Sequence, residues 1–126
     1  MIKKNKIYFC RHCGNVVESL WNGKPDISCC GENMTELEAN TKDAAREKHV
    51  PVITREGNKV TVRIGEAPHP MTNEHYILCI EVIAGAKVYR HNFKEGDSEA
   101  SAEFMIPDND NITARAFCNL HGLWQA

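Results

Sequence analysis

Four cysteines close to the start of the chain constrain its fold more than any other feature. Cys10 and Cys13 form a Cys-x2-Cys knuckle, and the adjacent pair Cys29-Cys30 follows after fifteen further residues. Four thiolates in a closed tetrahedron suit zinc or iron. Residues 6–37 contain only short apolar runs, too few for a core of their own, so a metal ion must supply the missing stability.

The cysteine spacing leaves the metal open between zinc and iron, because both accept four sulfur ligands in similar geometry. Cys29 and Cys30 are adjacent, and neighbouring side chains on an extended backbone diverge, so both can bind one ion only if the chain turns sharply. An ordinary zinc ribbon would carry a second Cys-x2-Cys, although a purely structural zinc site stays an alternative. A c-type haem is disfavoured because Gly14 rather than histidine follows Cys13.

The remainder of the chain predicts an all-β domain. Residues 38–48 are polar and read as a linker that can contain a helical turn, which divides the chain into domains 1–37 and 38–126. Strand-like stretches, rich in β-branched and aromatic residues and separated by turns, cover residues 52–54, 59–64, 76–83, 87–93, 102–106 and 112–117. A small antiparallel β-sandwich is the expected architecture.

The overall composition excludes several classes of protein. Hydrophobic residues make up 42% and charged residues 25%, which is typical of a globular protein in water. A net charge of -2 disfavours nucleic acid as a partner. We find no apolar run suited to a secretory signal or a membrane span, and we therefore expect a cytoplasmic protein, in which cysteines more often bind metal than form disulfides.

A second set of metal-ligand residues lies in the predicted β domain. It comprises His49, His69, His75, Cys118 and His121. A single histidine in such a domain is more often a packing or surface residue, but prolines flank His69 and the Cys118-x2-His121 loop can chelate. Four imidazoles and one thiolate exceed what tetrahedral zinc needs and suit an iron with one open position. A thiolate opposite that position would donate electron density to a bound ligand.

Two groups of motifs resemble a known family. Cys10-x2-Cys13 with Cys29-Cys30 resembles the desulforedoxin-like domain. Three further motifs resemble the superoxide reductase module, namely Glu47-Lys48-His49-Val50-Pro51, His69-Pro70-Met71 and Cys118-Asn119-Leu120-His121-Gly122. From Tyr8 to Trp124 the chain is therefore identified as a member of the desulfoferrodoxin family, the two-iron superoxide reductases.

The resemblance implies a fold and two iron centres. The first centre would be a distorted rubredoxin-like iron bound by Cys10, Cys13, Cys29 and Cys30. The second would hold iron by four equatorial histidines, His49, His69, His75 and His121, with Cys118 as the axial ligand. The implied fold is mainly β, with a small desulforedoxin-like domain followed by a seven-stranded immunoglobulin-like sandwich, and the family is usually homodimeric.

The implied activity is the reduction of superoxide to hydrogen peroxide in oxidative-stress defence, with electrons from a rubredoxin-like or other donor. Lys48 would attract the superoxide anion, and Glu47 would occupy the sixth position of the ferric resting state. Without the neighbouring motif, a solvated charged pair is the simpler interpretation of these two residues. Two other functions stay open, namely a non-catalytic two-iron electron-transfer protein and a zinc-ribbon module that recruits protein or nucleic acid.

Overall fold

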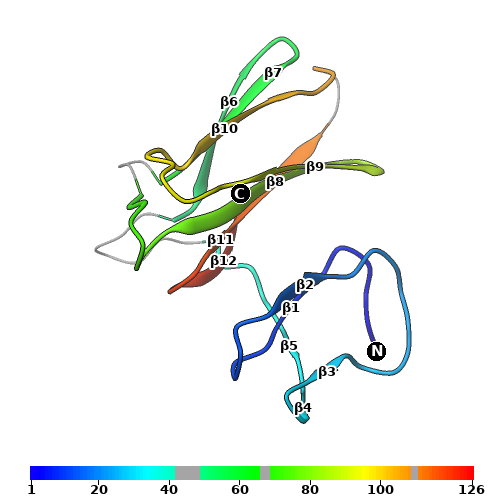
Figure 1. The fold of residues 1–126 in the computed structure, drawn as a ribbon. Coiled ribbons are helices and arrows are strands. Elements are labelled where there is room, and N and C mark those ends of the chain that lie inside the picture. The colour runs from blue at the N-terminus through cyan, green and yellow to red at the C-terminus, as the bar shows by residue number, and fades with distance from the viewer. Residues whose placement is uncertain (42–48, 66–68, 109–110) are drawn as a thin grey trace. The chain divides into compact units, whose positions relative to one another are not determined.

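The computed structural model describes residues 1–41, 49–65, 69–108 and 111–126, and within these residues every regular element is a β-strand (Figure 1). No helix in this described part is long and apolar enough to cross a membrane. The strands fall into two compact units, Met1–Glu38 and Ala39–Ala126. The mainly β fold class is confirmed.

The N-terminal unit is small and has little apolar interior. Its strands are β1 (Ile7–Phe9), β2 (Val16–Glu18), β3 (Ser28–Cys29), β4 (Glu32–Asn33) and β5 (Thr35–Glu36). Strand β1 lies between β2 and β5, and β3 pairs with β4 in a separate hairpin. Its buried hydrophobic residues are Ile2, Ile7, Tyr8 and Cys10 among those described. So few buried side chains cannot hold a unit of this size, which fits the expectation that a metal stabilises it.

The C-terminal unit is a β-sandwich of seven strands within the described residues. They are β6 (Pro51–Glu56), β7 (Lys59–Ile64), β8 (Ile77–Ala84), β9 (Lys87–Asn92), β10 (Ser101–Met105), β11 (Ile112–Cys118) and β12 (Gly122–Gln125). One sheet has the order β10-β7-β6 and the other β12-β11-β8-β9. In chain order these positions correspond to strands A, B and E and to C, C′, F and G of an immunoglobulin-like sandwich, as predicted.

The inner faces of the two sheets form one apolar core. Strand β7 shows the pattern most clearly, because Val60, Val62 and Ile64 are buried while Lys59 and Arg63 between and beside them are exposed. Alternation of this kind places one face of a strand inward. Each buried valine or isoleucine contributes roughly 1.5–3 kcal/mol relative to an exposed one. The sandwich is therefore a rigid support for the loops at its ends.

A β-bulge shapes the end of the sheet that carries Cys118. The pairing of β11 with β8 is regular until Phe117 opposite Cys79, and then shifts so that Cys118 lies opposite Ile77. Bulges bend a strand and redirect a side chain, and they are common beside active sites. Strand β12 then begins after a three-residue turn, where Cys118 pairs with Gly122. Our sequence prediction missed this short strand, since its four residues follow the Cys118–His121 loop directly.

The outer face of the four-stranded sheet contains a buried ionic network. Glu81 lies opposite Arg115 on one neighbouring strand and opposite Arg90 on the other. Arg115 donates from Nε to Oε1 of Glu81 at 2.8 Å, and Arg90 donates from Nη2 to Oε2 at 2.9 Å. The Glu81 and Arg115 side chains are 2% and 7% exposed. Both carboxylate oxygens are thus satisfied by charge-assisted hydrogen bonds across three strands.

Candidate metal centres

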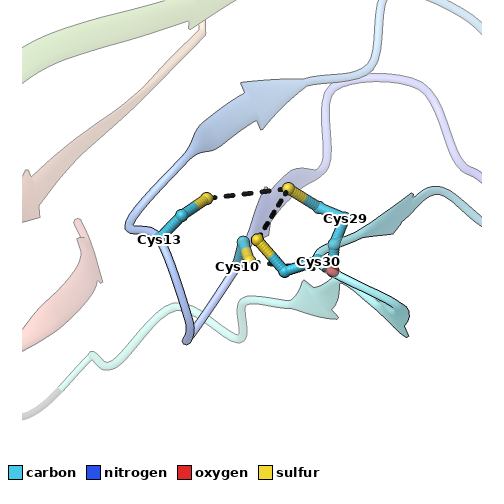
Figure 2. Close-up of side chains that lie close together, drawn as sticks. All are labelled: Cys10, Cys13, Cys29 and Cys30. Carbon is cyan, nitrogen blue, oxygen red and sulfur yellow. Dashed lines mark hydrogen bonds between the residues drawn. The ribbon is translucent and has the colours of Figure 1, made fainter.

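The four N-terminal cysteines converge on one point, as predicted. Figure 2 shows their side chains gathered in the same space, and their sulfur atoms all lie within 4.8 Å of one another. Cys13 Sγ lies 3.6 Å from Cys29 Sγ, and Cys29 Sγ lies 4.0 Å from Cys30 Sγ. A tetrahedron with metal–sulfur bonds of about 2.3 Å has sulfur–sulfur edges of about 3.8 Å. The group therefore fits a four-coordinate metal ion.

The sharp turn expected at the adjacent cysteines is the loop of the β3–β4 hairpin. Cys29 ends β3 opposite Glu32, so Cys30 and Gly31 form a two-residue loop. Both loop residues have positive φ, 54° at Cys30 and 77° at Gly31. Positive φ at both positions is the type I′ hairpin turn, which costs glycine little and another residue about 1–2 kcal/mol. This backbone allows two neighbouring thiols to reach one ion.

The knuckle supplies the other two thiols and stabilises one of them as a thiolate. Gly14, with φ 83°, lets the chain reverse so that its N–H donates to the Cys10 carbonyl oxygen at 2.9 Å. The backbone N–H of Cys13 is the main cause that lowers the pKa of Cys10 from 9.0 to about 6. Asn15 Nδ2, which the sequence did not indicate, approaches Cys29 Sγ at 3.6 Å. These donors favour negative charge on the sulfurs.

The second pair of thiols holds its protons more strongly without a metal. Hydrogen bonding to Cys13 and then to Cys10 raises the pKa of Cys30 to about 12. Hydrogen bonding to Cys13 also raises the pKa of Cys29. A thiol that donates a hydrogen bond to a neighbouring thiolate keeps its proton, because that hydrogen bond stabilises the thiolate. Metal binding at this centre must therefore displace protons.

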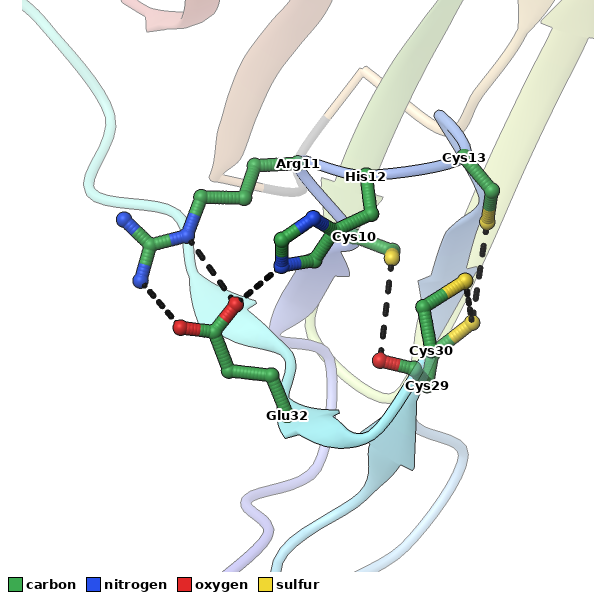
Figure 3. A network of polar contacts seen from close by, with 7 residues as sticks. All are labelled: Cys10, Arg11, His12, Cys13, Cys29, Cys30 and Glu32. Carbon is green, nitrogen blue, oxygen red and sulfur yellow. Dashed lines mark hydrogen bonds and ion pairs between the residues drawn. The ribbon is translucent and has the colours of Figure 1, made fainter.

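An exposed ionic network joins the knuckle to the hairpin (Figure 3). Arg11 donates from Nη2 to Oε1 of Glu32 at 2.8 Å, and His12 Nε2 contacts Oε2 of the same carboxylate. His12, and then Arg11, lower the pKa of Glu32. His12 thus lies inside the knuckle but faces Glu32 rather than the sulfurs. The network connects the two segments that carry the cysteines.

Four histidines of the C-terminal unit form a ring of imidazoles. Neighbouring ring centroids lie 4.7 Å apart for His49 and His69, 4.6 Å for His69 and His75, 5.0 Å for His75 and His121, and 4.8 Å for His121 and His49. The diagonal from His49 to His75 is longer, at 6.2 Å. Four near-equal sides and a longer diagonal describe a square. This cyclic order, 49-69-75-121, could not be inferred from the sequence.

Cys118 lies against this square and is buried. Its Sγ is 3.6 Å from His69 Nε2 and 3.8 Å from His121 Nδ1, which belong to opposite corners. Because Cys118 Sγ also lies within 4.8 Å of the ligand atoms of His49 and His75, the sulfur lies close to the axis of the square. The ligand atoms of His49, His75, Cys118 and His121 all lie within 4.8 Å of one another, and His69 borders them through its ring contacts and Cys118.

The hydrogen bonds of His69 define which of its nitrogens can coordinate. His69 Nδ1 lies 2.7 Å from the carbonyl oxygen of Pro70. A carbonyl only accepts, so the proton resides on Nδ1 and the lone pair of Nε2 faces Cys118. His121 instead presents Nδ1 toward the sulfur. The two histidines would thus use different nitrogens.

Trp124 supports the square from outside the donor set. Its ring stacks on His49 with centroids 4.7 Å apart and an angle of 15°, and its Nε1–H donates to the His121 carbonyl oxygen at 3.1 Å. Trp124 is 7% exposed and pairs with Ala116 on β11, two residues before Cys118. The sequence offered only its closeness to the last motif as an indication of this role.

The remaining two predicted site residues, Glu47 and Lys48, lie outside the described residues, as does most of the expected helical turn in 38–48.

The donor set of the second centre can be compared with the geometry that a metal ion requires. Opposite nitrogens of a square with bonds of about 2.1 Å lie about 4.2 Å apart, which agrees with ligand atoms within 4.8 Å. An iron ion in octahedral coordination would take these four nitrogens and one sulfur and have room for one more ligand, and His121 is exposed to solvent. The residues fit an iron ion better than a tetrahedral zinc.

Fold and sites together define a β protein with two groups of candidate metal ligands, a tetracysteine group and a four-histidine, one-cysteine group on an immunoglobulin-like sandwich. The Desulfoferrodoxin family model matches residues 41–126, and the model described as Desulfoferrodoxin, N-terminal domain matches residues 2–37. The chain belongs to the desulfoferrodoxin family.

Individual relatives agree with this assignment. A desulfoferrodoxin homolog from Archaeoglobus fulgidus is 48% identical over 126 residues, which cover 100% of this chain and 99% of the relative. The fold matches a superoxide reductase from Treponema pallidum with a TM-score of 0.79 over 99% of both chains, at 24% identity. A superoxide reductase from Giardia intestinalis matches 64% of this chain and 96% of its own, with a TM-score of 0.58 and 34% identity.

Proposed function

We propose that this chain is a superoxide reductase that uses the four-histidine, one-cysteine centre to reduce superoxide to hydrogen peroxide. The observation that carries the proposal is the square of four imidazoles with the Cys118 thiol near its axis. The reaction consumes one superoxide, one electron and two protons and yields one hydrogen peroxide. The similarity to superoxide reductases, including one at 34% identity, supports this substrate.

Both centres are proposed to hold iron, one in each of two domains, 1–37 and 38–126. The ligands would be Cys10, Cys13, Cys29 and Cys30 in the first, and His49, His69, His75, Cys118 and His121 in the second. At the second centre these residues would hold an iron whose chemistry is the transfer of one electron to superoxide, with one electron returned by an external reductant. The buried Cys118 thiolate would donate electron density to the bound iron.

Two charged residues next to His49 are proposed to act on the substrate and the open position. The Lys48 ammonium attracts the anionic substrate and stabilises the negative charge that accumulates on it. Glu47 offers a carboxylate that can occupy the open position when substrate is absent. Both roles depend on their place in the chain beside His49.

The decisive measurement is pulse radiolysis of the reduced, iron-loaded protein, with hydrogen peroxide and dioxygen both quantified. We expect one hydrogen peroxide per superoxide and no dioxygen, whereas dismutation would give half as much peroxide together with dioxygen. Azide or cyanide should also perturb the optical spectrum of the second centre. A spectrum that does not respond, in a protein that does not consume superoxide, would instead indicate a pure electron-transfer protein.

A matched pair of lysine variants tests the substrate-steering role. Lys48→Ile should slow superoxide capture most at low ionic strength, because screening weakens the attraction of Lys48 in wild type as salt rises. Lys87→Ile makes the same charge change far from the site. Lys87 pairs with Ala84 at the end of β8, about 23 Å along the strand from Ile77, which pairs with Cys118. An equal effect of both variants would show that only net charge matters.

We also propose a cytoplasmic homodimer that receives electrons from a rubredoxin-like or other small redox protein. Cysteines arranged as metal ligands fit a reducing compartment. Analytical ultracentrifugation of the iron-loaded protein tests the dimer. Reduction by candidate donors under anaerobic conditions, followed at the optical bands of the two centres, tests the donor.

A further inference from the structure

His75 lies just before β8, where no strand pairing holds its backbone. A short turn closes around it instead. The Thr72 N–H donates to the His75 carbonyl oxygen at 2.9 Å, and the His75 N–H donates to Thr72 Oγ1 at 3.1 Å. Both backbone polar groups of His75 are therefore held by Thr72.

Asn119 secures the residues on either side of His75. Its Oδ1 accepts from the Tyr76 N–H at 2.8 Å, and its Nδ2 donates to the Glu74 carbonyl oxygen at 2.9 Å. Its backbone N–H also donates to the Tyr76 carbonyl oxygen at 3.1 Å. The amide thus uses an acceptor at one end and a donor at the other, which no other small side chain reproduces.

The position of Asn119 makes these bonds relevant to the metal centre. It directly follows Cys118 and lies in the same three-residue turn as His121. We infer that Asn119 is a positioning residue that fixes the His75 imidazole relative to Cys118 and His121. The inference rests on the proposed function, since it assumes that these three side chains bind one iron. Three of the five ligands then belong to one hydrogen-bonded unit.

Residues behind the ligands commonly change metal affinity or activity by about 10- to 100-fold when replaced. We expect Asn119→Ala, which removes both side-chain bonds, to weaken iron binding at the second centre within that range. The ferric EPR signal and the thiolate-to-iron charge-transfer band should change as well. Asn119→Asp keeps the acceptor for Tyr76 but turns a carboxylate oxygen toward the Glu74 carbonyl oxygen, so it should also weaken iron binding. The optical bands of the tetracysteine centre should stay unchanged in both variants.

A matched control is available in the same unit. Asn58 Oδ1 accepts from the Asp108 N–H at 3.2 Å in the turn between β6 and β7, which carries no ligand. Asn58→Ala therefore removes a comparable bond from a loop and should lower stability without altering the EPR signal. A second variant that acts on His75 is Thr72→Val, which removes the hydroxyl that accepts from the His75 N–H and should alter the EPR signal in the same way. Thr72→Ser keeps a hydroxyl and should show the wild-type signal.

The inference fails if Asn119→Ala binds iron with wild-type affinity and an unchanged EPR signal, or if Asn58→Ala alters that signal equally. Should Asn119→Ala not fold, Thr72→Val compared with Thr72→Ser decides whether backbone bonds around His75 orient the ligand. A wild-type protein that shows no thiolate charge-transfer band would refute the proposed function itself. That outcome is distinct from a wild-type band that Asn119→Ala leaves unchanged.

Discussion

Replacing Trp124 tests whether its contacts with two ligands matter to the metal centre or only to the core. Trp124 stacks on His49 and donates to the His121 carbonyl oxygen, so it contacts two neighbouring corners of the square. Trp124→Phe keeps an aromatic ring beside His49 and removes the hydrogen bond. Trp124→Leu removes both.

The expected magnitudes follow from these contacts. Loss of the hydrogen bond costs about 1 kcal/mol, and the smaller ring brings the total for Trp124→Phe to roughly 1–2 kcal/mol. Truncation of a buried tryptophan to alanine costs about 3–5 kcal/mol, and leucine fills part of the cavity, so we expect roughly 2–4 kcal/mol for Trp124→Leu. The stack itself is worth about 0.5–1.5 kcal/mol. To the extent that the stack holds His49 in its ligand position, its loss should weaken metal binding by at most this energy, about two- to tenfold.

The assay is chemical unfolding of each variant without metal and with saturating metal, followed by far-ultraviolet circular dichroism. Metal stabilises the folded state according to its affinity, so a tenfold loss of affinity lowers the metal-linked gain by about 1.4 kcal/mol at fixed excess metal. Trp124→Leu should show this smaller gain, and Trp124→Phe should keep most of it. If each variant loses the same stability without metal and with saturating metal, so that it gains as much from metal as wild type, Trp124 is a core residue alone.

Three further predictions concern the other features. Glu81→Leu should destabilise the sandwich by about 3–5 kcal/mol in a urea titration, because it leaves Arg115 buried without its carboxylate. The control is Glu103, which forms an exposed ion pair, and Glu103→Leu should cost about 0–1 kcal/mol in the same titration. Chelation of metal should unfold the N-terminal unit and leave the sandwich folded, because only the sandwich has a large apolar core. Limited proteolysis measures this, and equal cleavage of both units would contradict it. Metal binding to the tetracysteine site at pH 7.5 should release the proton of Cys30, whose pKa is raised to about 12, so affinity should fall as the pH is lowered and should fall more steeply below pH 6, where Cys10 also protonates. Calorimetry in buffers of different ionisation enthalpy measures this release, and a binding reaction without proton release would contradict the reasoning.

The chemistry of both centres could be predicted because it depends on residue types and short spacings. Four cysteines in a segment with too small a core require a metal, and the spacing of Cys10 and Cys13 already brings two sulfurs together. The alternation in β7 and the turn residues between stretches likewise indicate a sandwich, since strand periodicity is local. Strand β12 escaped because it begins at Gly122 and its two buried residues, Leu123 and Trp124, are adjacent, so it shows no such periodicity.

Other features depended on contacts between distant parts of the chain. The left-handed backbone at Cys30, the bulge opposite Cys118 and the roles of Asn119 and Trp124 have no local pattern that predicts them. Each depends on which residues meet across a turn or a pair of strands. A shift of register by one residue would place every side chain of a strand on its other face.

The sequence by itself therefore determined which atoms are available to bind metal and which class of fold carries them. Only the tertiary structure decided the cyclic order of the histidines around Cys118, which nitrogen His69 presents, and which neighbours hold the ligands in place. The physical reason is that donor chemistry is a property of single residues. Geometry around an ion, in contrast, depends on the register and packing of strands that lie far apart in the chain.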